Sequence, residues 1–170
     1  MQQNSKNQFE VTDEILASQG QRFLNLLVDY VGQIVLMLLV GVVIGVISVV
    51  TGNPQLTTMF DNMNTLTEYG FTIVLVLIYY NLFEILTSRT LGKFITKTIV
   101  VDENGNKPEY QTIMIRSLCR LIPFDALSFL GANSRGWHDS ISRTYVVQKN
   151  LLEEKKRLFN SFEEIGKTEA

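Results

Sequence analysis

The stretch QRFLNLLVDYVGQIVLMLLVGVVIGVISVV, residues 21–50, decides where this protein resides. Apolar residues follow one another almost without interruption from Phe23 to Val50, and about 20 apolar residues in a helix are enough to cross a bilayer. The sequence therefore predicts a first membrane span at about residues 23–50. Asp29 lies inside this span, where a carboxylate costs about 2.5–3.5 kcal/mol and is therefore usually paired, hydrated or used in function.

A second apolar run, Phe71–Leu86, predicts a second span at about residues 70–87. Polar residues recur at helical spacing near its C-terminal end, and others form a stripe at the start of the first span. Two antiparallel spans bring these two ends to the same depth, so we expect one polar cluster between them. The side chains expected in this cluster are Arg22, Asn25, Asp29, Asn81 and Glu84.

The basic residues predict the orientation of the two spans. Residues 51–69 contain no Lys or Arg, whereas residues 89–120 contain six. The positive-inside rule therefore places residues 89–120 and both termini in the cytoplasm. The first apolar run is not preceded by a signal-peptide pattern, so we expect it to remain as an anchor.

Gly41 and Gly45 give the first predicted span a small-x-x-x-small surface. Such a surface lets another helix approach closely, either from a second copy in a homo-oligomer or from a different membrane protein. Chance spacing of glycines in a valine-rich run is the alternative interpretation.

The chain divides into a polar arm at residues 1–16, a membrane region at 17–148 and a charged tail at 149–170. In the arm, Phe9–Val11 fits a brief strand and Thr12 fits the N-cap of a short helix, although a solvated leader is the favoured interpretation. The tail predicts an amphipathic helix that lies on the membrane, packs on a partner or stays solvated.

Between the second span and the tail, residues 94–101 predict a strand, Asn104-Gly105 a turn and residues 108–120 a helix. The apolar run 121–132 is too short to cross and predicts a re-entrant or interfacial segment, with a third crossing as the alternative. Residues 144–147 are strand-like. The predicted fold class is an all-α membrane protein with two transmembrane helices, this short segment and a small β-turn element in the cytoplasmic loop.

Several functions are excluded by composition and spacing. A net charge of −2 leaves no basic patch of the kind that binds nucleic acid. One cysteine, Cys119, and one histidine, His138, supply neither an internal disulfide nor a zinc site. The loop after Asp102 lacks the glycine and glutamate of an EF-hand, and Gly92-Lys93 lacks the upstream glycine of a phosphate loop. We therefore predict no enzyme, no cofactor and no metal site, and interpret His138 as an interfacial polar residue.

Several motifs occur in an order and spacing that resemble the RDD family of bacterial membrane proteins. They are Arg22-Phe23-x-Asn25-x-x-x-Asp29, Thr90-Leu91-Gly92-Lys93, Val100-Val101-Asp102 with Gly105, Arg116, and Trp137-His138-Asp139 followed by Thr144-x-Val146-Val147. The resemblance covers about residues 17–148. It implies that the arginine and two aspartates of the family name are Arg22, Asp29 and Asp139. It also implies a bacterial inner-membrane protein with these three residues in one cluster near the cytoplasmic face.

Two functions follow as expectations. In the first, Arg22 holds Asp29 and Asp139 together, and the protein serves in the lipid bilayer as a scaffold or as the subunit of a membrane-protein partner. In the second, Asp29 and Glu84 bind a cation or a proton in a small oligomeric transporter, with neighbouring amide side chains as neutral ligands. Ion or proton-coupled transport has been suggested for members of the family that the chain resembles.

Overall fold

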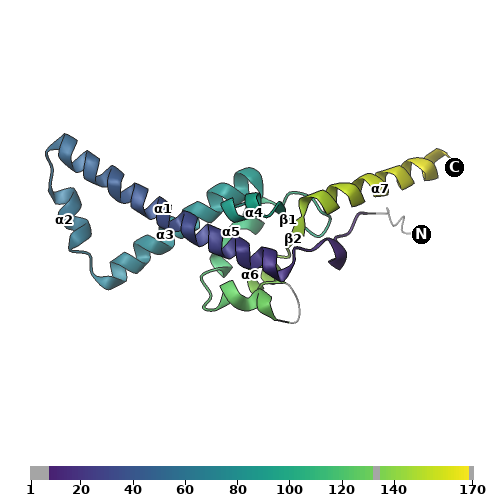
Figure 1. The fold of residues 1–170 in the computed structure, drawn as a ribbon, viewed down its shortest axis with the longest axis horizontal. Coiled ribbons are helices and arrows are strands. Elements are labelled where there is room, and N and C mark those ends of the chain that lie inside the picture. The colour runs from purple at the N-terminus through teal and green to yellow at the C-terminus, as the bar shows by residue number, and fades with distance from the viewer. Residues whose placement is uncertain (1–7, 132–134, 169–170) are drawn as a thin grey trace.

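The computed structural model describes residues 8–131 and 135–168. The description leaves out residues 1–7, which belong to the predicted polar arm, and also residues 132–134 and 169–170. The molecule is elongated (Figure 1). Helix α2 (Gln55–Asp61) lies at one end, and helices α1 (Gln19–Thr51) and α3 (Thr65–Thr87) run from it to the middle. The shorter helices gather around the middle, and the C-terminal helix extends to the opposite end.

Helix α1 begins at Gln19, four residues before the predicted start of the span. The Ser18 side chain accepts a hydrogen bond from the backbone N–H of Gln21 at 3.2 Å, and the Gln21 side chain accepts one from the backbone N–H of Ser18 at 2.9 Å. This capping box stabilises the first turn. The helix ends where Gly52 adopts a left-handed φ of 63°. Hydropathy marks where the apolar surface begins, whereas the caps determine where the helix begins.

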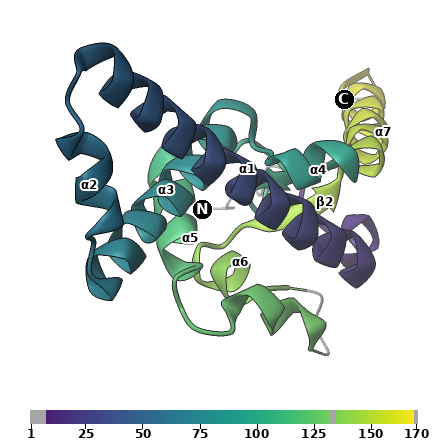
Figure 2. The same ribbon diagram turned by 60° about the vertical axis from the view of Figure 1, so that its left-hand side comes forward.

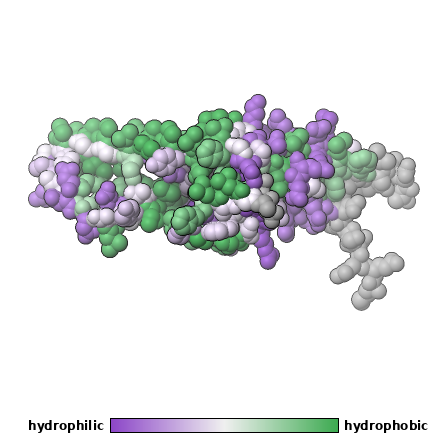
Figure 3. Space-filling model, turned by 60° about the horizontal axis from the view of Figure 1, so that its bottom comes forward, coloured by the Kyte–Doolittle hydropathy of each residue, from purple (hydrophilic) through white to green (hydrophobic). Residues whose placement is uncertain are grey.

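Helix α3 also starts before its predicted boundary, because Asn64 caps it by accepting the backbone N–H of Thr67 at 2.8 Å. By length and composition, two segments can each cross a membrane: α1 itself, and Thr65–Ile95, which contains α3 and the short helix after it. Only 6% and 17% of their most apolar windows are buried inside the chain. Apolar side chains accordingly dominate the surface along this part of the molecule (Figure 3), and they need lipid or another protein to cover them.

The remaining elements are the 3-10 helices η1 (Asp13–Ile15) and η2 (Asp125–Leu130), the helices α4 (Leu91–Ile95), α5 (Tyr110–Cys119), α6 (Trp137–Ile141) and α7 (Lys149–Thr168), and the strands β1 (Thr98–Val101) and β2 (Tyr145–Gln148). The predicted helix at 108–120, the late strand and the tail helix are present within a few residues of their predicted bounds. The described part of the 121–132 run forms turns and η2, and it contains no helix long enough to span a bilayer.

The fold is mostly helical, as predicted, and the two predicted strand regions pair with each other: β1 and β2 form an antiparallel sheet, a pairing that the sequence did not predict. Thr98 lies opposite Gln148 and Val101 lies opposite Tyr145. The predicted strand at 94–101 was wrong in its first part, which belongs to α4. The cause is tertiary: the carboxylate of Asp29 accepts the backbone N–H of Gly92 at 2.8 Å and so satisfies a donor at the start of this short helix.

The described part of the N-terminal arm is packed, and a solvated leader was the wrong interpretation. Ile15 is buried with Val101, Val147 and Leu152 in a small core between the sheet and α7. The backbone N–H of Ala17 donates to the carbonyl of Val146 at 2.9 Å, which ties the arm to β2. The arm forms η1, as the Thr12 signal suggested, but no strand at residues 9–11. The arm, the sheet and the first turns of α7 therefore form a base from which α1 emerges.

Candidate functional site

Buried charged side chains gather where α1 begins and α3 ends. Helix α4 packs along the first turns of α1 (Figure 2), and α5 and α6 pack on each other beside them. The charged side chains that are buried here are Arg22, Asp29, Glu84, Lys93, Arg116, Asp125 and Asp139. So many ionised groups out of water demand partners, because an isolated buried charge is strongly unfavourable.

Asp139 on α6 is fully buried and is bound by two arginines. Arg22 Nη1 donates to Asp139 Oδ2, and Arg116 Nη1 donates to Asp139 Oδ1. Burial alone would raise the pKa of Asp139, but the charges of Arg116 and Arg22 hold this pKa well below its ordinary range. The carboxylate is therefore ionised and joins α1, α5 and α6.

Glu84 on α3 is also fully buried, and three cationic side chains surround it. Lys93 Nζ lies 2.9 Å from Oε1, and Arg120 Nη2 lies 3.3 Å from the same oxygen. Arg116 Nε donates to Oε2 at 3.1 Å while its Nη1 reaches Asp139. Arg116 therefore bridges the two carboxylates and links α3 to α6.

Asp29 is held by neutral donors instead of a cation. Its carboxylate accepts hydrogen bonds from Tyr79 Oη at 3.0 Å, Thr90 Oγ1 at 2.6 Å and the backbone N–H of Gly92 at 2.8 Å. Among the buried carboxylates in the described part of the chain, Asp29 is the one that pairs with no Arg, Lys or His side chain. Arg22, which was expected to hold both aspartates, binds Asp139 only.

Thr90 joins Asp29 to the ion pairs around Glu84. Its hydroxyl donates to Asp29 and accepts from Lys93 Nζ at 3.4 Å, and Lys93 in turn binds Glu84. One path of hydrogen bonds and ion pairs therefore connects α1, α4, α3, α5 and α6 and then returns to α1. Its members, in order, are Asp29, Thr90, Lys93, Glu84, Arg116, Asp139 and Arg22. We call this set the charged network.

The two predicted amides lie beside the charged network and not within it. Asn25 accepts a hydrogen bond from Thr96 Oγ1 at 2.5 Å and donates to Thr98 Oγ1 at 3.2 Å, which ties α1 to the junction of α4 and β1. Asn81 donates to the carbonyl of Leu77 in its own helix at 2.9 Å. Neither amide therefore lies against both carboxylates, as a shared cation site would require.

The predicted packing glycines are uncovered. A Cβ added at Gly41 or Gly45 meets no atom within 4 Å, and Gly41 lines a cavity of about 300 Å³ that residues of α2 and α3 also line. The close helix contact occurs instead at Gly92, where an added Cβ would lie 2.5 Å from the backbone oxygen of Asn25. A glycine that allows helices to touch is therefore present, but in α4.

Several site residues escaped the sequence prediction, namely Lys93, Arg116, Arg120, Asp125 and His138. Both arginines lie in the predicted helix at 108–120, but nothing in the sequence indicated that this helix packs against α3. His138 is buried by the protein: its Nδ1 lies 2.7 Å from Asp125 Oδ2, and its backbone N–H donates to Asp125 Oδ1 at 2.8 Å. This pair fixes α6 against η2.

Burial and the neighbouring positive charges of Arg120 and Arg116 lower the pKa of His138 to about 4. Since an ionised carboxylate only accepts, the neutral imidazole carries its proton on Nδ1 toward Asp125. Burial opposes the ionisation of Asp125, but the hydrogen bonds from the side chain and the backbone N–H of His138 hold the pKa of this carboxyl below its ordinary value.

We expect acid to destabilise the protein through His138. Between pH 7 and pH 4 the unfolded chain gains a proton on this imidazole and the folded chain does not, so stability falls as the pH falls, by at most about 3 kcal/mol. The carboxylates with lowered pKa lose their contribution at still lower pH. The measurement is the midpoint of thermal unfolding in detergent micelles across this range. A His138→Gln variant with the same pH slope as the wild type would contradict the expectation.

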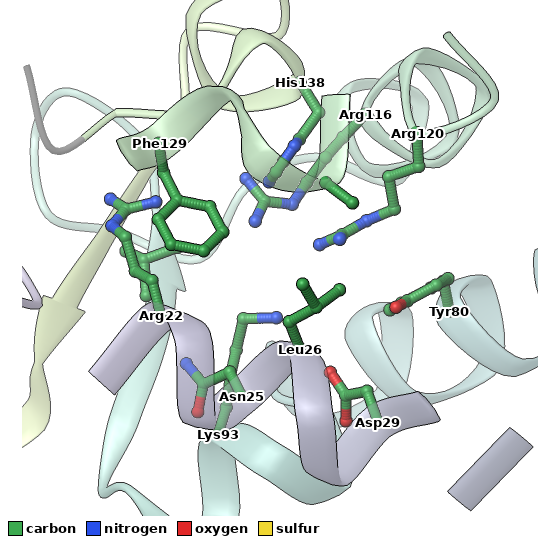
Figure 4. A pocket seen from close by; sticks show the side chains of 12 residues that line it. Arg22, Asn25, Leu26, Asp29, Tyr80, Lys93, Arg116, Arg120, Phe129 and His138 are labelled. Atoms are coloured by element: carbon green, nitrogen blue, oxygen red, sulfur yellow. The ribbon is translucent and has the colours of Figure 1, made fainter. Parts of the chain in front are cut away.

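A cavity of about 40 Å³ lies at the centre of the site. Figure 4 shows the guanidinium groups of Arg116 and Arg120 and the ammonium group of Lys93 directed into it from different elements. A water needs about 10–15 Å³, so the cavity has room for a small polar group or a few waters.

The fold and the site define a small helical membrane protein with two apolar helices and a buried network of charges at one end of them. The RDD family model matches residues 16–143, and the chain belongs to the RDD family. This confirms the family that the sequence motifs suggested. No curated protein and no solved structure is similar enough to the chain to count as a match.

Proposed function

We propose that this RDD-family chain is a multi-pass inner-membrane protein in which the charged network locks the helices together, and that it serves as a scaffold or partner subunit. The observation that carries the proposal is the double engagement of Asp139 by Arg22 from α1 and Arg116 from α5. Short elements that cannot bury much apolar surface are thereby fixed to the first membrane helix.

Charge distribution supports an orientation with both termini in the cytoplasm. Three of the six basic residues between 89 and 120 are used in the buried site, which leaves Arg89, Lys97 and Lys107 for the positive-inside bias. The opposite end, around α2, has none between residues 51 and 69. The bias is reduced by half but keeps its sign.

Exposed apolar side chains support an interfacial or re-entrant position for the segment around η2 and α6. Side chains of this kind at the base of the membrane helices are Ile122, Phe124, Leu127, Leu130, Trp137 and Ile141. Tryptophan is enriched where hydrocarbon meets headgroups. The lock then fixes an interfacial platform beside the cytoplasmic ends of the two spans.

The uncovered glycines support a role with partners. Gly45 leaves open space on α1, which a second membrane helix can approach. A homo-oligomer and a complex with a different membrane protein both use such a surface. Cross-linking in membranes measures the oligomers that the wild type and Gly45→Leu form, and it separates the two cases. If the wild type forms a homo-oligomer through this surface, the oligomer disappears in Gly45→Leu. If the wild type is only monomeric, the surface is left for a different membrane protein.

Transport of protons or cations is the second candidate, and Asp29 is the reason to keep it. This carboxylate is buried, lacks an ion pair and lines the central cavity. Glu84 supports the transport candidate less, because the cationic groups of Lys93, Arg116 and Arg120 around it repel a metal ion.

Asp29→Asn discriminates between the two candidates. The lock predicts that Asp29→Asn lowers the free energy of unfolding by about 1–3 kcal/mol and so reduces the amount of folded protein. The reason is that an amide cannot accept hydrogen bonds from three donors as a carboxylate does. Transport predicts a normal amount of folded protein whose ion flux in sealed liposomes is abolished. Asp61→Asn, in α2 at the far end, is the matched control. The lock is supported if the wild type shows no ion flux above empty liposomes and Asp29→Asn is destabilised. An Asp29→Asn protein as stable as the wild type contradicts it.

A further inference from the structure

The arginines of the charged network have more donors than the protein itself satisfies. Arg22 uses Nη1 on Asp139, while its Nε and Nη2 are buried without a hydrogen-bond partner in the described chain. These two nitrogens form one edge of the guanidinium. That edge presents two parallel N–H donors, the arrangement that binds two oxygens of a phosphate or carboxylate.

Two further arginines around the central cavity also keep an unused donor. Arg116 Nη2 and Arg120 Nε are buried without a partner among the described residues. Arg22, Arg116, Arg120 and Lys93 all line the cavity of about 40 Å³, and Figure 4 shows the last three directed into it. Unpaired charged donors in a buried site are costly, so an acceptor in this space is strongly favoured.

The charges on the cavity wall select the sign of the acceptor. Four of the side chains that line it are cationic and one, Asp29, is a carboxylate. Both oxygens of Asp29 are already engaged by Tyr79, Thr90 and Gly92. Glu84 and Asp139 form ion pairs with these cations but do not line the cavity. An anionic oxygen group therefore fits the wall better than a cation does.

We propose that this cavity binds a phosphate group, held by the unused donors of Arg116 and Arg120 next to the ammonium group of Lys93, with Arg22 adding positive charge to the wall. A tetrahedral group offers oxygens in several directions and can meet donors that come from α4 and α5 together. The phosphate comes either from the headgroup of an anionic phospholipid or from inorganic phosphate in solution. Neither ligand is required by the lock, so this site goes beyond the proposed function.

The single tryptophan of the chain, Trp137, adjoins His138 in α6 and gives an intrinsic probe of binding. Full-length protein in a neutral detergent is titrated with sodium phosphate, with sodium chloride at matched ionic strength as reference. In a second arm the protein is placed in phosphatidylcholine nanodiscs with or without phosphatidylglycerol. We expect a saturable change in fluorescence and a higher thermal midpoint with phosphate, with phosphatidylglycerol, or with both.

Arg120→Gln tests the site with little risk to the fold, because Arg120 is the partly exposed member with the longest contact to Glu84, 3.3 Å. We expect its affinity for the phosphate ligand to fall at least about tenfold, since a hydrogen bond to a charged group is lost. Arg89→Gln is the matched control, because Arg89 also carries a buried unpaired Nη2 but does not line the cavity. Ala126→Leu narrows the cavity without removing a charge and should weaken binding as well.

The outcomes separate the two sources. Binding of phosphatidylglycerol alone assigns the site to a lipid headgroup, and binding of sodium phosphate alone assigns it to a free ion. Binding of both, with mutual competition, shows one site that accepts either. The proposal is overturned if neither ligand changes fluorescence or the thermal midpoint beyond the chloride reference. It is equally overturned if Arg120→Gln and Ala126→Leu bind as tightly as Arg89→Gln.

Discussion

Replacing Asp139 by asparagine is expected to lower the free energy of unfolding by about 3–5 kcal/mol, which is the cost typical of removing one partner from a buried ion pair. The variant keeps the size of the side chain but leaves Arg22 and Arg116 without their shared carboxylate. Since both arginines are buried, solvent cannot replace the lost charge. The measurement is unfolding in a denaturing-detergent titration, together with the amount of folded protein recovered from membranes.

A double-mutant cycle assigns this loss to the pair. Arg22→Gln alone is also expected to destabilise, and the double variant should be less unstable than the sum of the two single variants, because it removes the charge that each leaves behind. Glu153→Gln, at an exposed i, i+4 pair with Lys149, is the control and should change stability by less than about 0.5 kcal/mol. Additive effects of Arg22→Gln and Asp139→Asn would show that the two side chains do not stabilise each other.

Gly92→Ala is the second substitution with a large expected effect, about 3 kcal/mol or more. Its Cβ would lie 2.5 Å from the backbone oxygen and 2.6 Å from the Cα of Asn25, and neither backbone atom can rotate aside. Helix α4 must then move away from α1. That movement also weakens the hydrogen bond from the Gly92 backbone N–H to Asp29 and displaces Lys93 from Glu84.

Gly41→Ala is the control for the loss at Gly92. The same added methyl group meets no atom within 4 Å on α1, and alanine is the better helix former by about 1 kcal/mol, so this variant should be neutral or slightly stabilising. Thermal midpoints of both variants in detergent test the contrast. A Gly92→Ala protein as stable as Gly41→Ala would show that α4 does not touch α1 so closely.

The sequence predicted the membrane helices well because hydropathy is a local property. The apolar runs at 23–50 and 70–87 lie inside helices α1 and α3, and only the capped first turns were missed. The family motifs were equally readable, since the order and spacing of short motifs need no tertiary knowledge. The match over residues 16–143 is close to the region inferred from them.

The site was predicted in part. The sequence placed Arg22, Asp29 and Glu84 near one another because antiparallel spans bring them to a common depth. It did not predict which cation meets which carboxylate, because that choice depends on helices α4, α5 and α6, which are too short for hydropathy to position. Asp139 entered through the family resemblance alone.

The sequence by itself therefore determined that the chain has two membrane-length helices with ionised groups at their polar ends, since both follow from residue type along a continuous helix. Only the tertiary structure decided that Asp29 caps α4, that Arg116 joins two carboxylates and that Arg22 keeps a free edge. The contacts of Asp29 and Arg116 join residues 23 to 63 positions apart. Their energies depend on burial and on the direction of individual N–H groups, which exist only once the helices have packed.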